Sequence, residues 1–90
     1  MGAVATSIHD KLTAAFQPTR LEVVDDSDRH KGHAGARGGG ESHFNVVIES
    51  MAFQGVGRVQ RQRAVLAALA EELAGPVHAL SIQARAPGEG

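Results

Sequence analysis

The sequence Ser-His-Phe-Asn-Val-Val-Ile-Glu-Ser at residues 42–50 alternates between apolar and polar side chains. Successive side chains of a β-strand point to opposite faces of its sheet, so this pattern predicts a strand with one buried face. Phe44, Val46 and Ile48 are expected to face the core. The opposite face is expected to carry His43, Asn45, Val47 and Glu49. The chain is therefore expected to contain a sheet with one covered and one exposed face.

Upstream of this strand, the run Leu-Glu-Val-Val-Asp-Asp at residues 21–26 predicts a second, short strand. The two strands are separated by residues 27–41, which combine mixed charges with many glycines and are expected to form a flexible loop. A loop of this length in so small a domain is typical of a functional segment. The two strands and this loop together indicate an antiparallel hairpin.

Downstream, residues 58–74 are predicted to form a helix that packs on the sheet. Its apolar stripe is expected to consist of Val59, Leu66, Leu69, Ala70 and Leu73. Glu71 and Glu72 then lie near the C-terminal end, where the helix dipole disfavours negative charge. This helix must therefore be stabilised by packing against the core or against a partner.

A third strand is predicted over residues 77–86, and a first helix over residues 3–16. The element order is then helix, strand, strand, helix, strand. A three-stranded mixed sheet with both helices on one face would bury every apolar stripe, which makes the chain an α+β two-layer sandwich. We expect one domain over residues 1–90, with a core of about residues 4–86 and a frayed tail at residues 87–90.

Composition limits the classes of function that this chain can have. Its 90 residues suffice for one small domain, and the net charge of -1 with three aromatic residues disfavours a broad nucleic-acid-binding surface. We find no phosphate-binding loop motif and no supported catalytic triad, so an enzyme is not expected. We also find no apolar run of membrane-spanning length and no signal-peptide pattern, so a cytoplasmic protein is expected.

Histidine is the best soft-metal ligand available in a chain that has no cysteine. His78 is expected at the start of the third strand, on its apolar face, and His30 and His33 fall within the glycine-rich loop that ends beside His43. A strand histidine beside a histidine-containing loop predicts a metal-binding function. A mononuclear zinc site made from these four histidines is an alternative, although their spacing matches no standard zinc module.

Four short motifs follow one another along the chain. They are Leu-Glu-Val-Val-Asp-Asp-Ser at residues 21–27, Gly-Glu-Ser-His-Phe at residues 40–44, Arg61-Gln62-Arg63 followed by Leu-Ala-Glu-Glu-Leu at residues 69–73, and Val-His-Ala-Leu at residues 77–80. Together they closely resemble the BolA family over roughly residues 5–87.

The resemblance implies a fold similar to the type II KH domain and a partnership with a monothiol glutaredoxin. In this family the two proteins can bridge a 2Fe-2S cluster, which connects them with iron–sulfur assembly, cluster delivery and iron sensing. The strand ligand of the family matches His78, and the second ligand comes from the loop between the first two strands, where His33 and His30 are both candidates. Glutaredoxin with glutathione would supply the sulfur ligands. One departure is Gln62, which stands where the family often has a histidine.

The alternative function is a DNA-binding transcriptional regulator, because some bacterial members of the family are described as such. Arg58, Arg61 and Arg63 would then contact DNA, and the same arginines could instead contact a partner's carboxylates. Gly55 and Gly57 precede them without the Gly-X-X-Gly spacing of a KH domain. The sequence does not decide whether the free chain forms a homodimer.

Overall fold

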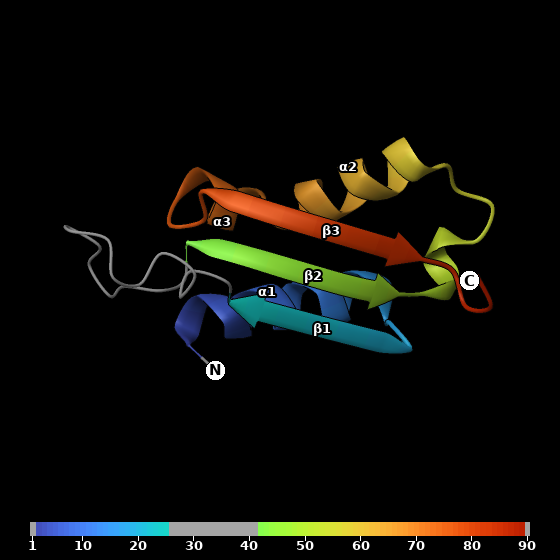
Figure 1. The fold of residues 1–90 in the computed structure, drawn as a ribbon, viewed down its shortest axis with the longest axis horizontal. Helices are drawn as coiled ribbons and strands as arrows, with labels where there is room; N and C mark the ends of the chain where they lie inside the picture. The colour runs from blue at the N-terminus through green and yellow to red at the C-terminus, as the bar shows by residue number, and fades with distance from the viewer. Residues whose placement is uncertain (1, 26–41, 90) are drawn as a thin grey trace.

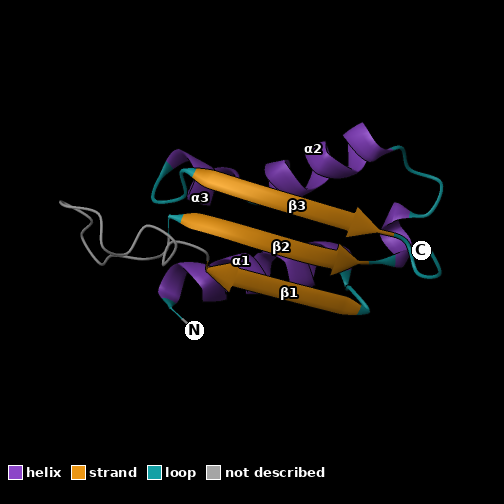
Figure 2. Cartoon of the chain, viewed as in Figure 1, coloured by secondary structure: helices purple, strands orange, loops and turns teal. Residues whose placement is uncertain are grey.

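The computed structural model describes residues 2–25 and 42–89 of the chain. Along the chain these residues form α1 (Ala3–Phe16), β1 (Arg20–Asp25), β2 (His43–Glu49), the 3-10 helix η2 (Met51–Phe53), α2 (Arg58–Ala68), α3 (Ala70–Ala74) and β3 (Ala79–Arg85) (Figures 1 and 2). The predicted strands and first helix are confirmed to within one or two residues at each end. Every helix in the two described ranges is too short or too polar to span a bilayer.

The sheet has the strand order β1-β2-β3, with β2 at its centre. β2 pairs antiparallel with β1 and parallel with β3, so that Val46 lies opposite both Val23 and Ile82. Figure 1 shows α1 behind β1 and β2, and α2 running along β3. The predicted mixed sheet and two-layer α+β architecture are therefore confirmed.

The face of the sheet that the helices cover holds the hydrophobic core. Phe44, Val46 and Ile48 of β2 are each at most 2% exposed, as the alternating pattern predicts. The same cluster contains Ala5, Ile8 and Leu12 of α1, Phe53 of η2, Val65 of α2, and Leu69, Val77 and Ala86. Burial of these apolar side chains is the main stabilising contribution to the fold.

The single helix predicted over residues 58–74 is wrong, because the structure ends α2 at Ala68 and starts α3 at Ala70. Leu69 between them has φ −107° and ψ 21°, outside the helical region. Residues 64–70 are entirely apolar, so the sequence pattern contains no polar residue that could mark the break. Glu71 and Glu72 lie in the first turn of α3, so the expected conflict with a helix dipole does not arise.

The predicted apolar stripe of α2 is also wrong in part. Val59 is 60% exposed and Leu66 is 38% exposed, whereas Val65 is fully buried. α2 is rotated so that Arg61, Gln62 and Val65 lie toward β3, and the predicted stripe lies partly on the solvent side. The reason is that Arg61 and Gln62 both donate hydrogen bonds to backbone carbonyl groups of β3.

Glu72 is a buried carboxylate that joins α3 to α1. It is 8% exposed, accepts a hydrogen bond of 2.6 Å from the Ser7 hydroxyl, and lies 2.8 Å from the Lys11 ammonium. Burial raises the pKa of Glu72, but the hydrogen bonds from Lys11 and Ser7 outweigh burial and hold that pKa below its ordinary value. Ser7 therefore anchors α3 and does not cap α1, whose N-cap residue is Gly2.

Replacing Ser7 by alanine is expected to lower the free energy of unfolding by about 1–2 kcal/mol, because a buried carboxylate loses one hydrogen-bond donor. Urea denaturation at neutral pH measures this change. Thr6→Ala is the matched control, since Thr6 is its exposed neighbour in the same helix. Equal stability of the two variants would show that the bond between Ser7 and Glu72 contributes nothing.

Candidate functional site

His78 lies directly before β3 and is exposed, while its neighbour Val77 is 3% exposed. The backbone N–H of His78 donates to the carbonyl oxygen of Ser42 at 2.8 Å, and that of Ala79 donates to the same oxygen at 3.2 Å. The structure starts β3 at Ala79, one residue after His78, and the His78 side chain is exposed and not buried with the apolar face of the strand. The main chain holds this residue in place, and its imidazole makes no hydrogen bond or ion pair with residues 2–25 or 42–89.

The segment between β1 and β2 begins and ends at the same end of the sheet as His78. Asp25 at the end of β1 pairs with Phe44, and His43 at the start of β2 pairs with Ala79. His30 and His33 belong to this segment and lie outside the described residues, as does the predicted flexible loop over residues 27–41. The structure thus places His78 where the histidine-containing segment rejoins the sheet. A pairing of His78 with either loop histidine stays a prediction.

His43 makes a local contact in the sheet, as a surface strand residue would. Its Nδ1 atom lies 2.9 Å from the hydroxyl oxygen of Ser42. With Asn45, Ala79 and Ser81 it borders a shallow cavity of about 200 Å³ between β2 and β3. Within residues 2–25 and 42–89 there is no group of three or more histidine, aspartate or glutamate side chains that could hold a metal ion. The zinc alternative also requires His30 and His33, which are not among these residues.

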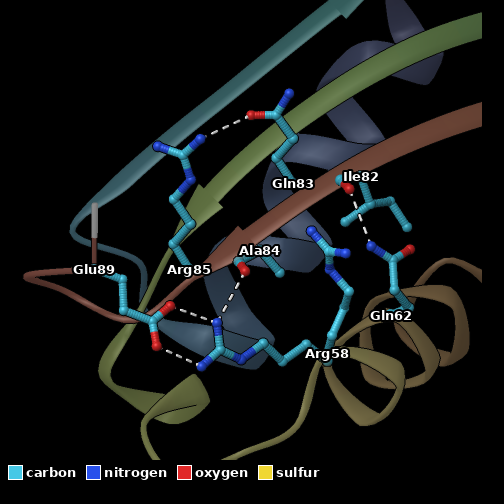
Figure 3. Close-up of a pocket in the computed structure, with 8 residues that line it drawn as sticks. Arg58, Gln62, Ile82, Gln83, Ala84, Arg85 and Glu89 are labelled. Carbon is cyan, nitrogen blue, oxygen red and sulfur yellow. Dashed lines mark hydrogen bonds and ion pairs between the residues drawn. The ribbon is translucent and has the colours of Figure 1, made fainter.

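Arg61 makes its contacts within the fold and offers few donors to DNA or a partner, so its expected binding role stays a prediction with little structural support. Its guanidinium donates to the carbonyl oxygens of Val56 at 2.7 Å and Ala84 at 3.1 Å. The same group makes two hydrogen bonds, of 2.6 and 2.7 Å, with the two carboxylate oxygens of Glu89 (Figure 3). The Arg61 side chain is 13% exposed. This bidentate geometry is the strongest form of an arginine–carboxylate pair. It leaves few N–H donors of the Arg61 guanidinium for a ligand.

Gln62 has a structural role of the same kind. Its side-chain amide donates to the carbonyl oxygen of Ile82 at 3.0 Å, two residues before the carbonyl that Arg61 contacts (Figure 3). β3 is an edge strand, and an edge strand with unpaired backbone groups invites pairing with other chains. Arg61 and Gln62 therefore protect part of the outer edge of β3 and fix α2 against it.

Glu89 anchors the C-terminal turn in the segment over residues 87–90 where a frayed tail is expected. Besides binding Arg61, its carboxylate accepts a hydrogen bond of 3.0 Å from the backbone N–H of Ala86. The sequence pattern did not indicate this role, because Arg61 and Glu89 are 28 residues apart and no local motif connects them. Hydrogen bonds from Arg61 and Ala86 lower the pKa of Glu89 to about 2.

In the Glu89→Gln variant, the free energy of unfolding is expected to fall less steeply than in the wild type as the pH is lowered below about 5. The folded pKa of Glu89 is about 2 against an ordinary value of 4.5, so its stabilising effect is complete above the ordinary value. That effect is lost as pH falls from about 4.5 toward 2, because the unfolded chain takes up the proton first. Thermal unfolding between about pH 5 and 2.5 measures this slope. The exposed-carboxylate control Asp10→Asn should keep the wild-type slope, and a wild-type slope in Glu89→Gln would contradict the proposed role of the pair.

Arg58 and Arg63 are the arginines of α2 that remain exposed. Arg58 borders an open cavity of about 500 Å³ together with Gln83, Arg85 and the pair formed by Arg61 and Glu89 (Figure 3). Of the three arginines predicted as contacts, two therefore remain available to a ligand.

Known proteins resemble this chain along nearly its whole length. Human BolA-like protein 1 is 48% identical over 89 residues, which cover 99% of this chain and 62% of the human protein. The protein named DNA-binding transcriptional regulator BolA of Escherichia coli (strain K12) is 51% identical over 75 residues, which cover 83% of this chain and 68% of that protein. Neither name is that of an enzyme.

A solved structure gives the same result for the fold. The BolA domain of SufE1 from Arabidopsis thaliana superposes with a TM-score of 0.87 at 42% identity, covering 100% of this chain and 99% of that one. The family model described as BolA-like protein matches residues 12–89, which include every described strand and most of the described helical residues. This chain belongs to the BolA family.

Proposed function

We propose that this chain is an adaptor that holds a 2Fe-2S cluster jointly with a monothiol glutaredoxin and glutathione, in iron–sulfur cluster assembly, delivery or sensing. The observation that supports this most strongly is the position of His78. Its imidazole is exposed and has no partner within residues 2–25 or 42–89, and it lies where the segment with His30 and His33 rejoins the sheet.

The chemistry of the donors requires a shared site. A 2Fe-2S cluster needs four protein or small-molecule ligands, most often thiolates, and this chain has no cysteine. Its own contribution would be two imidazoles, from His78 and from either His33 or His30. A glutaredoxin thiolate and the thiolate of glutathione would complete the set. Imidazole ligation of one iron has a precedent in Rieske centres.

The described residues fit this role as one half of a site. A buried histidine within a complete ligand set would indicate a metal centre belonging to this chain alone. Instead, His78 is exposed, and residues 2–25 and 42–89 contain no group of three acidic or histidine side chains suited to a metal. The backbone hydrogen bond to Ser42 holds His78 in position before any partner arrives, which reduces the entropy lost on binding.

The proposal is tested by mixing the chain with a monothiol glutaredoxin, glutathione, ferric iron and sulfide under anaerobic conditions. We expect a coloured complex that contains both proteins on size-exclusion chromatography, with a visible circular dichroism spectrum that glutaredoxin alone does not give. A coloured species that elutes without this chain, and has the same spectrum as glutaredoxin alone, would overturn the proposal.

The alternative function, DNA binding, draws support from the name of the Escherichia coli relative. Of the three arginines predicted to contact DNA, Arg61 is already bound to Glu89 and to two backbone carbonyl groups. Two exposed arginines on α2 are few, since proteins that bind duplex DNA tightly make about 6–10 phosphate contacts. We therefore favour the adaptor.

A further inference from the structure

Glu72 is a buried charged residue with contacts both to α1 and to the turn that leads to His78. It is 8% exposed, although a carboxylate is costly to remove from water. A buried ion pair often adds little stability over apolar residues of similar volume, and its benefit in some proteins is to specify one geometry. The contacts of Glu72 indicate which geometry it specifies here.

The side chain of Glu72 is fixed by α1. The Ser7 hydroxyl donates to the carboxylate oxygen Oε2 at 2.6 Å. The Lys11 ammonium lies 2.8 Å from the same oxygen and donates to Oε1 at 3.1 Å. α1 is itself held in the core by Ile8 and Leu12, which are both fully buried. The Glu72 carboxylate is therefore attached to a helix that the core keeps in place.

The main chain of Glu72 holds the turn that follows α3. Its carbonyl oxygen accepts hydrogen bonds from the backbone N–H of Gly75 at 3.2 Å and from that of Val77 at 3.0 Å. Val77 is 3% exposed and belongs to the core, and His78 is the next residue. Figure 1 shows α3 at the end of the sheet where β3 begins. Glu72 thus contacts α1 with its side chain and the residue before His78 with its backbone.

A second set of backbone hydrogen bonds completes the support of His78. The N–H groups of His78 and Ala79 donate to the carbonyl oxygen of Ser42, which directly precedes β2. The N–H of Val77 is bound on the other side, by α3. Because peptide groups are planar, these bonds fix the orientation of the peptides on both sides of His78. They therefore set the direction in which its side chain leaves the backbone.

We propose that Glu72 is a positioning residue for His78, an inference that rests on the proposed role of His78 as a ligand of the shared cluster. The carboxylate bound to α1 fixes α3, and the Glu72 carbonyl transmits that position to Val77 and so to the imidazole. Contacts that orient a metal-binding histidine often change metal affinity by about 10–100-fold. A histidine held in place before the cluster arrives also loses less entropy when it binds. Glu72 therefore prolongs the lifetime of the shared cluster.

A purely structural role of the ion pair is the competing explanation. It predicts that Glu72 affects His78 only through the overall stability of the fold, so that any variant of equal stability would have the same effect. Ile48→Val supplies such a variant, because the loss of one buried methyl group and the loss of one hydrogen bond destabilise to a comparable extent. Ile48 pairs with Ala84, about 16 Å along β3 from its first residue.

The first measurement is amide hydrogen exchange of the free chain, followed by nuclear magnetic resonance, in Glu72→Gln and in Ser7→Ala. The amides of Val77 and His78 are compared with that of Val46, in the middle of β2. Relative to Val46, we expect them to exchange about tenfold faster than in the wild type. Ile48→Val should keep the wild-type ratio. Ser7→Ala also decides the result if Glu72→Gln does not fold, because its substitution lies on α1 and leaves α3 unchanged.

The second measurement is the decay of the cluster in the complex with glutaredoxin, followed by visible circular dichroism after an iron chelator is added in excess. We expect about fivefold faster decay in Glu72→Gln and Ser7→Ala than in the wild type and in Ile48→Val. Equal decay in all four proteins, or equal exchange ratios, would overturn the proposal. A wild-type chain that forms no shared cluster would overturn the proposed function instead. The exchange ratios, which need no iron, would then still decide whether Glu72 holds the main chain at His78.

Discussion

Replacing Phe53 by alanine is expected to lower the free energy of unfolding by about 3–5 kcal/mol. Phe53 ends η2, directly after β2, and is 1% exposed. Its ring lies 5.0 Å from that of Phe16 at the end of α1, centroid to centroid, with the planes tilted by 38°. Removing it would leave a cavity where α1 meets the end of the central strand. A small domain has a total stability of about 5–15 kcal/mol, so the loss would be a large part of it.

Urea denaturation at neutral pH measures this change, with Met51→Ala as the control. Met51 begins the same 3-10 helix but is 62% exposed, so its truncation should cost far less. If Phe53→Ala were no less stable than Met51→Ala, burial of Phe53 would not contribute to the stability of the core.

His78→Ala is expected to abolish the shared cluster while leaving the fold unchanged. The exposed imidazole makes no contact by hydrogen bond or ion pair with the described residues, so its removal should not change the free energy of unfolding. The mixture with glutaredoxin should lose the spectrum of the heterodimeric complex, because the proposal assigns this imidazole as a ligand of the cluster. Anaerobic absorption and circular dichroism spectra give the measurement.

Controls at other histidines make this result specific. His9→Ala removes a histidine of α1 and should leave the cluster spectrum unchanged. The double variant His30→Ala/His33→Ala should lose the complex as His78→Ala does, if either loop histidine is the second ligand. An unchanged spectrum in both His78→Ala and the double variant would show that the cluster is held without imidazole from this chain.

The sheet could be predicted because its strands have one buried face. Alternation at Phe44, Val46 and Ile48 reports the two-residue period of a strand directly, and the structure buries all three. The break of the second helix at Leu69 could not be predicted, since every residue from 64 to 70 is apolar and helix-compatible. The rotation of α2 could not be predicted either, because Val59 and Leu66 look like core residues until the acceptors on β3 are known.

The candidate site was partly visible in the sequence. His78 and the neighbouring histidine-containing segment could be found from residue type and motif, because metal chemistry restricts the side chains that can serve. The internal role of Arg61 could not be found, since its carboxylate partner Glu89 is distant in the chain. Only the structure reveals the bond from the Gln62 amide to the Ile82 carbonyl.

The central claim, that an imidazole of this chain ligates iron, is tested most directly by pulsed electron paramagnetic resonance on the reduced cluster. The chain is labelled with ¹⁵N-histidine and combined with unlabelled glutaredoxin and glutathione. The account predicts hyperfine coupling from the labelled nitrogen in the wild-type complex, and no such coupling when the label is placed only in glutaredoxin. A bound cluster that shows no coupling to the labelled histidines would contradict it.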